Sequence, residues 1–82
     1  MVYVKVCGIT NREDARTATR SGADAVGLVF AESPRKLNVE QAREIAATLP
    51  DSILQVGVFV DEKPEEVLRI VREVGLDYAQ LH

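Results

Sequence analysis

The chain has 82 residues, of which 46% are hydrophobic and 28% are charged, and its formal net charge is -3. This composition is typical of a small folded protein rather than a disordered one. The acidic balance gives no reason to expect nucleic acid as a partner, and apolar stretches of about five to eight residues are too short to cross a membrane.

The chain contains a single cysteine, Cys7, which cannot form an internal disulfide. A lone cysteine agrees with a reducing compartment. No positively charged leader with an apolar segment opens the chain, so we expect a cytoplasmic protein. No segment has the spacing of a metal-ligand cluster, and we expect neither a metal nor another cofactor.

The first third of the chain predicts a strand, a helix and a second strand. Residues 3–8 are mostly apolar, which indicates the first strand. Thr10 and Glu13 have the spacing of a capping box and should open a helix. Gly22 should end this helix, because glycine adopts the left-handed conformation without a steric penalty. Residues 25–30 form a second apolar run, bounded and strand-like.

The next helix should begin at Asn38, which has Gln41 at the reciprocal capping position, and should end at Pro50. Residues 53–60 are rich in branched apolar side chains and predict the third strand. The apolar stripe expected on this second helix consists of Ala42, Ile45, Ala46 and Leu49.

A third helix should have Pro64 in its first turn and Gly75 at its end. Residues 78–82 predict the start of a fourth strand. The apolar stripe expected on this third helix consists of Val67, Leu68, Ile70, Val71 and Val74.

Strands that are apolar on both faces and alternate with amphipathic helices indicate an α/β fold with a parallel sheet. Residues 1–82 are expected to form one domain. Their order fits either an open doubly wound sheet or an arc of a (β/α)8 TIM barrel. The turn at residues 7–10 lacks the spaced glycines of a dinucleotide site, which favours the partial barrel. Residues 21–26 also resemble residues 74–79, which suggests a repeating β-α unit.

Cys7 is the main candidate for chemistry, because it lies at a strand end, where α/β folds place their active sites. Alternation puts Lys5 on the same face, and a nearby ammonium would favour the thiolate. A thiolate there could act as a general base or a nucleophile. The alternative is a buried, inert cysteine that serves as a small hydrophobe. Lys5 itself needs either an acidic partner inside a barrel or an exposed edge.

Two more residues are candidates for binding. Arg35 follows Ser33 and Pro34 in a loop on the same rim as Cys7. Its guanidinium could bind a carboxylate or a phosphate through two hydrogen bonds, or it could simply be solvated. His82 should lie at the outgoing end of the fourth strand, where it could hydrogen-bond to a ligand or be merely a frayed terminal residue.

Several segments together resemble a known family. In chain order they are Val-Lys-Val-Cys-Gly-Ile-Thr-Asn, Ser-Gly-Ala-Asp-Ala-Val-Gly-Leu-Val-Phe, Ser-Pro-Arg, Val-Gly-Val-Phe and Ala-Gln-Leu-His. In this order and spacing they resemble the N-terminal part of phosphoribosylanthranilate isomerase, an enzyme family of tryptophan biosynthesis. The Lys-x-Cys-Gly-Ile-Thr opening is the most specific of these segments.

The resemblance implies a single barrel of eight β/α units and an Amadori rearrangement of N-(5-phosphoribosyl)anthranilate to an aminoketose. It implies that Cys7 is the general base. Arg35 would hold the anthranilate carboxylate, and His82 would lie near this small-molecule phosphosugar substrate.

The family's general acid, an aspartate in the second half of the barrel, and its phosphate site are absent from this chain. We therefore expect no useful activity from the chain alone. Two open sheet edges and an apolar inner face favour a homodimer or a larger assembly, since two copies supply the eight strands of a small barrel. The alternative is a stand-alone or engineered self-associating module with an open sheet. A strand order of 1-2-3-4 would favour the barrel arc.

Overall fold

The computed structural model describes residues 2–82, which form a parallel sheet of four strands and three helices. Every predicted element is present, although each strand is shorter than expected. In order the elements are β1 (Lys5–Cys7), α1 (Arg12–Arg20), β2 (Ala25–Val29), α2 (Val39–Ala46), β3 (Leu54–Phe59), α3 (Pro64–Val74) and β4 (Tyr78–Leu81).

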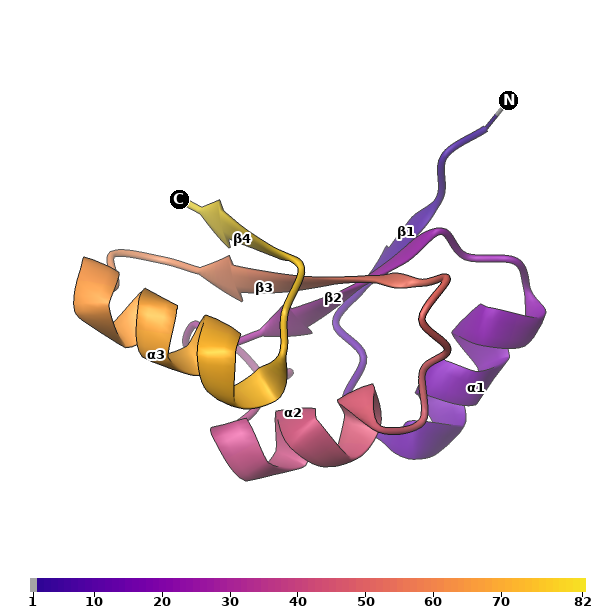
Figure 1. The fold of residues 1–82 in the computed structure, drawn as a ribbon, viewed down its shortest axis with the longest axis horizontal. Helices are drawn as coiled ribbons and strands as arrows, with labels where there is room; N and C mark the ends of the chain where they lie inside the picture. Colours follow the sequence, from indigo (N-terminus) through magenta and orange to yellow (C-terminus); the bar gives the residue numbers. More distant parts are fainter. Residues whose placement is uncertain (1) are drawn as a thin grey trace.

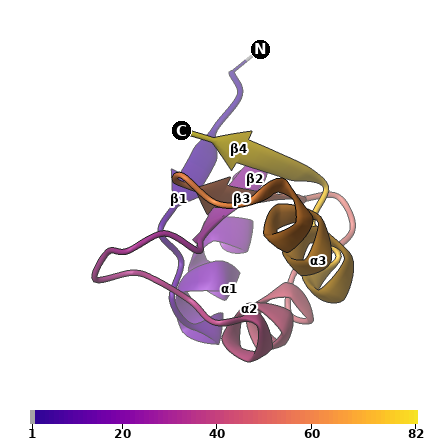
Figure 2. The ribbon, with the colours of Figure 1, turned by 90° about the vertical axis from the view of Figure 1, so that its left-hand side faces the viewer.

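The strands lie side by side in the order β1-β2-β3-β4, and each neighbouring pair is parallel. All three helices lie on the same face of the sheet (Figures 1 and 2). A doubly wound sheet places helices on both faces, whereas a barrel places them only outside. The strand order and the one-sided helices therefore confirm the α/β partial-barrel fold.

The helix ends follow the local sequence, with one correction. The predicted capping box at Thr10 is wrong, because the N-cap of α1 is Asn11, whose side chain accepts a hydrogen bond from the Asp14 N–H at 2.8 Å. Asparagine is a better N-cap residue than threonine, so α1 begins one residue later than predicted. The capping box at Asn38 and the left-handed end of α3 at Gly75 are confirmed.

The hydrophobic core lies between the sheet and the helices. Its largest fully buried side chains are Phe59, Leu28 and Val26, and the Phe59 ring stacks on Phe30 at 5.3 Å between centroids. Leu68 does not belong to the stripe predicted for α3, because it is 54% exposed on the outer side of the helix. The predicted end of α2 at Pro50 is also wrong: the helix ends at Ala46, and a turn continues to the buried Leu49.

Two aspartates explain the internal similarity of residues 21–26 and 74–79. The Asp24 carboxylate accepts the Val4 N–H at 2.7 Å, and the Asp24 N–H donates to the Val4 carbonyl. Asp77 makes the same pair of bonds with Gln55, with a side-chain distance of 2.8 Å. Each aspartate therefore fastens the start of its strand to the preceding strand.

The other face of the sheet carries no helix, and we refer to it as the open face. Strand alternation places on it the side chains of Lys5, Cys7, Ala25, Val29, Leu54, Val56, Val58, Tyr78 and Gln80, together with Gly27. The last strand, β4, is poorly covered, since only Gln80 among its residues is not exposed. None of the helices in residues 2–82 has the length and apolar character needed to span a membrane.

Candidate active site on the open face

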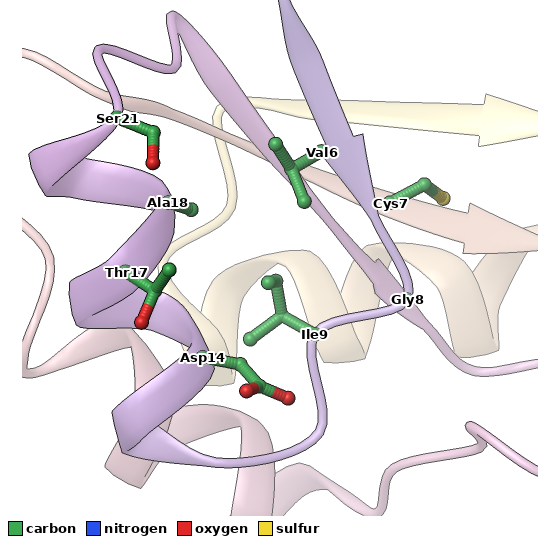
Figure 3. A pocket seen from close by; sticks show the side chains of 8 residues that line it. All are labelled: Val6, Cys7, Gly8, Ile9, Asp14, Thr17, Ala18 and Ser21. Carbon is green, nitrogen blue, oxygen red and sulfur yellow. The ribbon is translucent and has the colours of Figure 1, made fainter.

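Cys7 is the last residue of β1, and its side chain is exposed. The neighbouring Val6 packs against the core, so alternation turns Cys7 to the open face. Figure 3 shows Val6 pointing toward α1 and the Cys7 side chain pointing away from it. The prediction of a buried cysteine that serves as a small hydrophobe is therefore wrong.

Gly27 makes room for the thiol. It is paired with Cys7 in the register of β1 and β2, and a Cβ atom at this position would lie 2.7 Å from Cys7 Sγ. Any larger residue would push the sulfur from its place. This role was not predicted from the sequence, although a glycine inside a strand is a recognised sign of a close approach.

The loop after β2 brings Arg35 to the turn that follows Cys7. Ser33 accepts the Arg35 N–H through its hydroxyl at 3.0 Å and the Lys36 N–H through its carbonyl at 3.1 Å, which fixes a tight turn. The side chain of Arg35 then packs over Gly8, where an added Cβ would overlap Arg35 Cδ. The prediction that Arg35 and Cys7 share one rim is confirmed. Within residues 2–82 no carboxylate forms an ion pair with the Arg35 guanidinium.

His82 follows β4 and is held in place by its backbone. Its N–H donates to the Phe59 carbonyl at 3.0 Å, and its own carbonyl accepts the Asp61 N–H at 3.2 Å. The alternative of a frayed terminal residue is therefore wrong. Its ring Nε2 lies 2.7 Å from Nε2 of Gln80, so both side chains are on the open face.

Lys5 crosses the open face to reach the far edge of the sheet. Its ammonium donates to Gln80 Oε1 at 2.6 Å, although β2 and β3 separate their strands. The sequence predicted either an acidic partner or an exposed edge, and the partner is instead a neutral amide. Gln80 was not predicted as a site residue, but its spacing of two from His82 could have indicated the shared face.

A groove of about 390 Å³ lies beside β1 and is lined by Val6, Cys7, Gly8, Ile9, Asp14, Thr17, Ala18 and Ser21. It runs between β1 and α1, as Figure 3 shows, while the thiol points to the other side of the strand. The groove is therefore not where the thiol would react.

Two clear changes in pKa lie outside the open face. The hydrogen bond from Lys36 lowers the pKa of Glu32, and the hydrogen bond to Glu66 raises the pKa of Arg69. Both pairs are exposed surface contacts. Among residues 2–82, histidine, cysteine and acidic side chains form no group of three or more that could hold a metal ion.

Comparison with known proteins gives a consistent result. Residues 4–82 match the family model described as N-(5'phosphoribosyl)anthranilate (PRA) isomerase. The chain is 64% identical to the N-(5'-phosphoribosyl)anthranilate isomerase of Rubrobacter xylanophilus, over 100% of this chain and 40% of that protein.

Solved structures agree with this match. The phosphoribosyl anthranilate isomerase of Thermotoga maritima superimposes with a TM-score of 0.97 at 52% identity, over 100% of this chain and 40% of that one. A phosphoribosyl anthranilate isomerase in complex with reduced 1-(O-carboxyphenylamino)-1-deoxyribulose 5-phosphate has the same TM-score and identity, with 43% of its chain covered. The chain thus spans about 40% of the length of the relatives it matches. From its sequence and from its fold alike, the chain belongs to the phosphoribosylanthranilate isomerase family.

Proposed function

We propose that residues 1–82 form one unit and supply the proton-abstracting part of a site for the Amadori rearrangement of N-(5-phosphoribosyl)anthranilate. The observation that carries this proposal is the exposed Cys7 thiol at the carboxyl end of β1, over Gly27 and next to the turn where Arg35 packs on Gly8. The carboxyl ends of the strands are where barrel enzymes of this architecture hold their substrates.

We assign to each residue the role that the family resemblance implies and that its chemistry allows. As a thiolate, Cys7 takes the proton from C2′ of the ring-opened iminium form of the phosphosugar. The electron pair of the C2′–H bond forms the C1′–C2′ double bond, and the π electrons of the C1′–N double bond move onto the nitrogen. Arg35 offers an unpaired planar guanidinium for the anthranilate carboxylate. His82 offers a ring nitrogen for a hydrogen bond. The ligand of the related complex combines a carboxyphenyl group with a sugar phosphate, which supports this division of roles.

The chain alone should not turn over substrate at a useful rate. The aspartate acid and the phosphate-binding loops that the family resemblance implies are absent from these residues. General acid catalysis alone contributes about 10²–10⁴-fold, and positioning of the substrate contributes further. An assay of the purified chain should therefore give no turnover above background, and turnover close to that of a complete barrel would contradict the proposal.

A chimera tests the positive part of the proposal. In it, residues 1–82 replace the corresponding segment of the Thermotoga maritima enzyme, which is 52% identical over this region. The chimera should be active, and Cys7→Ala should lower kcat by about 10²-fold or more, the usual contribution of a general base. Leu68→Ala, on the exposed outer side of α3, is the control and should leave kcat unchanged. An active Cys7→Ala chimera would remove Cys7 from the mechanism.

We also propose that the isolated chain forms a homodimer through the open face. That face and the exposed β4 leave apolar side chains such as Tyr78, which is 60% exposed, in contact with water. Tyr78→Glu should shift the chain to monomer in sedimentation velocity, whereas Leu68→Glu, which changes a similarly exposed residue on the helix side, should not. A wild-type monomer at micromolar concentration would contradict the dimer.

The alternative of a refolded open-sheet module receives no support from the strand order, which runs sequentially from β1 to β4. We further infer a cytoplasmic location for the chain, with tryptophan biosynthesis as its pathway. The exposed, unpaired Cys7 supports this location, because such a thiol persists in a reducing compartment.

A further inference from the structure

We propose that Lys5 and Gln80 are positioning residues that place the proton of His82 on Nδ1 when its imidazole is neutral. The Nδ1–H, and not Nε2, is then the group that His82 presents to a ligand. Only the identity of the ligand group that accepts a hydrogen bond from this Nδ1–H rests on the proposed function. The tautomer itself follows from hydrogen bonds within the chain.

The first step concerns the orientation of the Gln80 amide. A lysine ammonium has three donors and no acceptor, so only an acceptor can face it. Lys5 Nζ lies 2.6 Å from Gln80 Oε1, and this contact fixes the carbonyl oxygen toward β1. The amide nitrogen of Gln80 must then lie on the opposite side, toward the end of β4.

The second step concerns the ring of His82. Gln80 Nε2 carries two hydrogens and cannot accept a hydrogen bond. It lies 2.7 Å from His82 Nε2, so this ring nitrogen must be the unprotonated acceptor. In a neutral imidazole the other ring nitrogen, Nδ1, then carries the proton. The hydrogen bond made by one ring nitrogen commonly determines which of the two is protonated.

The third step concerns the charges around the bridge. On the open face the strands present only Lys5, Cys7 and Tyr78 as titratable groups. The carboxylates of Asp24 and Asp77 are held by backbone N–H groups at the starts of the strands, and Asp61 follows β3 on the adjoining loop. No carboxylate from the described strands therefore accepts from the imidazole.

The choice of an amide at position 80 is decisive for this reason. A carboxylate there would accept from Lys5 with one oxygen and from His82 Nε2–H with the other, and it would select the opposite tautomer. The Gln80 amide instead selects the tautomer with the proton on Nδ1, because its Nε2 donates a hydrogen bond to His82 Nε2. The Nδ1–H of His82 has no hydrogen-bond partner among residues 2–82, and it is free for an oxygen of the ligand.

The tautomer can be measured directly, because His82 is the only histidine of the chain. We would record long-range proton–nitrogen NMR correlations on the ¹⁵N-labelled chain at pH of about 8, where an unperturbed imidazole is neutral. The expected result is a protonated Nδ1 and an unprotonated Nε2. A wild-type spectrum with the proton on Nε2, or with equal populations, would overturn the proposal.

Two variants separate this role from simple packing. Gln80→Glu should move the proton to Nε2 and so exchange the two nitrogen signals. Lys5→Met removes the donor that orients the amide, and it should shift the spectrum toward a mixture of both tautomers. Lys63→Met, a change of the exposed lysine before α3, is the matched control and should keep the wild-type pattern. Unchanged tautomers in both Gln80→Glu and Lys5→Met, with a folded backbone spectrum, would also overturn the proposal.

The outcome is independent of catalysis. If the chimera lacks activity while the His82 proton remains on Nδ1, the proposed function fails and the positioning role stands. If the chimera is active while His82 carries its proton on Nε2, the positioning role fails and the proposed function stands.

Discussion

The two faces of the sheet are built from the same strands, yet they differ in almost every physical property. The helix side buries Leu28 and Phe59 almost completely, and the buried side chains of the chain are all hydrophobic among the described residues. The open face carries a lysine, a thiol and a glutamine whose polar atoms contact each other or solvent. The alternation of side chains along each strand thus places the stabilising core on one face and the candidate reactive groups on the other.

This separation has a consequence for how the chain tolerates change. The helix side has to exclude water and be packed at interior density, so adding or removing one methyl group there changes the free energy of unfolding. The open face has to keep a few polar groups in a fixed arrangement, and its apolar positions contribute less to folding. Substitutions of the same kind on the two faces should therefore have different effects.

The largest contrast is expected between two leucines. Leu28→Ala, on the helix side, should lower the free energy of unfolding by about 2–5 kcal/mol, because it leaves a cavity in the core. This loss is a large part of the roughly 4–12 kcal/mol expected for a domain of this size. Leu54→Ala, at a half-buried position of the open face, should cost about 1–2 kcal/mol.

Urea unfolding followed by circular dichroism measures both free energies of unfolding, at a protein concentration low enough to keep the chain monomeric. Equal losses for Leu28→Ala and Leu54→Ala would show that the open face is packed as tightly as the core, and the contrast between the faces would be lost.

A smaller contrast is expected between two glycines in neighbouring strands. A Cβ at Gly57 would lie 2.5 Å from Leu76 Cδ1 on the helix side, so Gly57→Ala should cost about 1–3 kcal/mol by overpacking. A Cβ at Gly27 would instead meet the Cys7 sulfur. Gly27→Ala should cost less stability, but it should slow the reaction of Cys7 with iodoacetamide several-fold.

The two variants serve as controls for each other, since each is measured by both urea unfolding and the rate of alkylation. If Gly57→Ala slows alkylation as much as Gly27→Ala does, then the thiol responds to the packing of the whole sheet and not to its local space.

The smallest effect is expected for a surface pair that touches neither face. Lys36 lowers the pKa of Glu32, and both side chains are exposed. A lowered carboxyl pKa stabilises the folded state above the ordinary pKa of glutamate, and that contribution is lost as the pH falls through the lowered value. Because solvent screens the pair, Lys36→Ala should leave the urea midpoint unchanged within error at about pH 7 and at about pH 3. A clear loss at the higher pH alone would show that this loop contributes to folding.

Signals within one turn of the chain are enough to place most elements of this protein. The pair Asn38 and Gln41 fixes the start of α2, and Gly75 fixes the end of α3, because a cap depends only on residues within one turn. The position of Cys7 at the end of the first strand follows in the same way from a short apolar run. Local rules fail where two caps compete, as at Thr10 and Asn11, since one residue of shift changes little in the pattern.

The groups that meet across the sheet are brought together by long-range contacts instead. The contact between Lys5 and Gln80 joins residues that are 75 positions apart, and it exists because the sheet brings the side chains of β1 and β4 over one face. The room that Gly27 leaves for the Cys7 sulfur depends likewise on the register of two strands. Strands and helices could be predicted from the amino-acid sequence, since they depend on neighbours along the chain. Pairing across strands depends on register and curvature, which no short segment contains, and so the contact of Lys5 with Gln80 could be recognised only in the folded molecule.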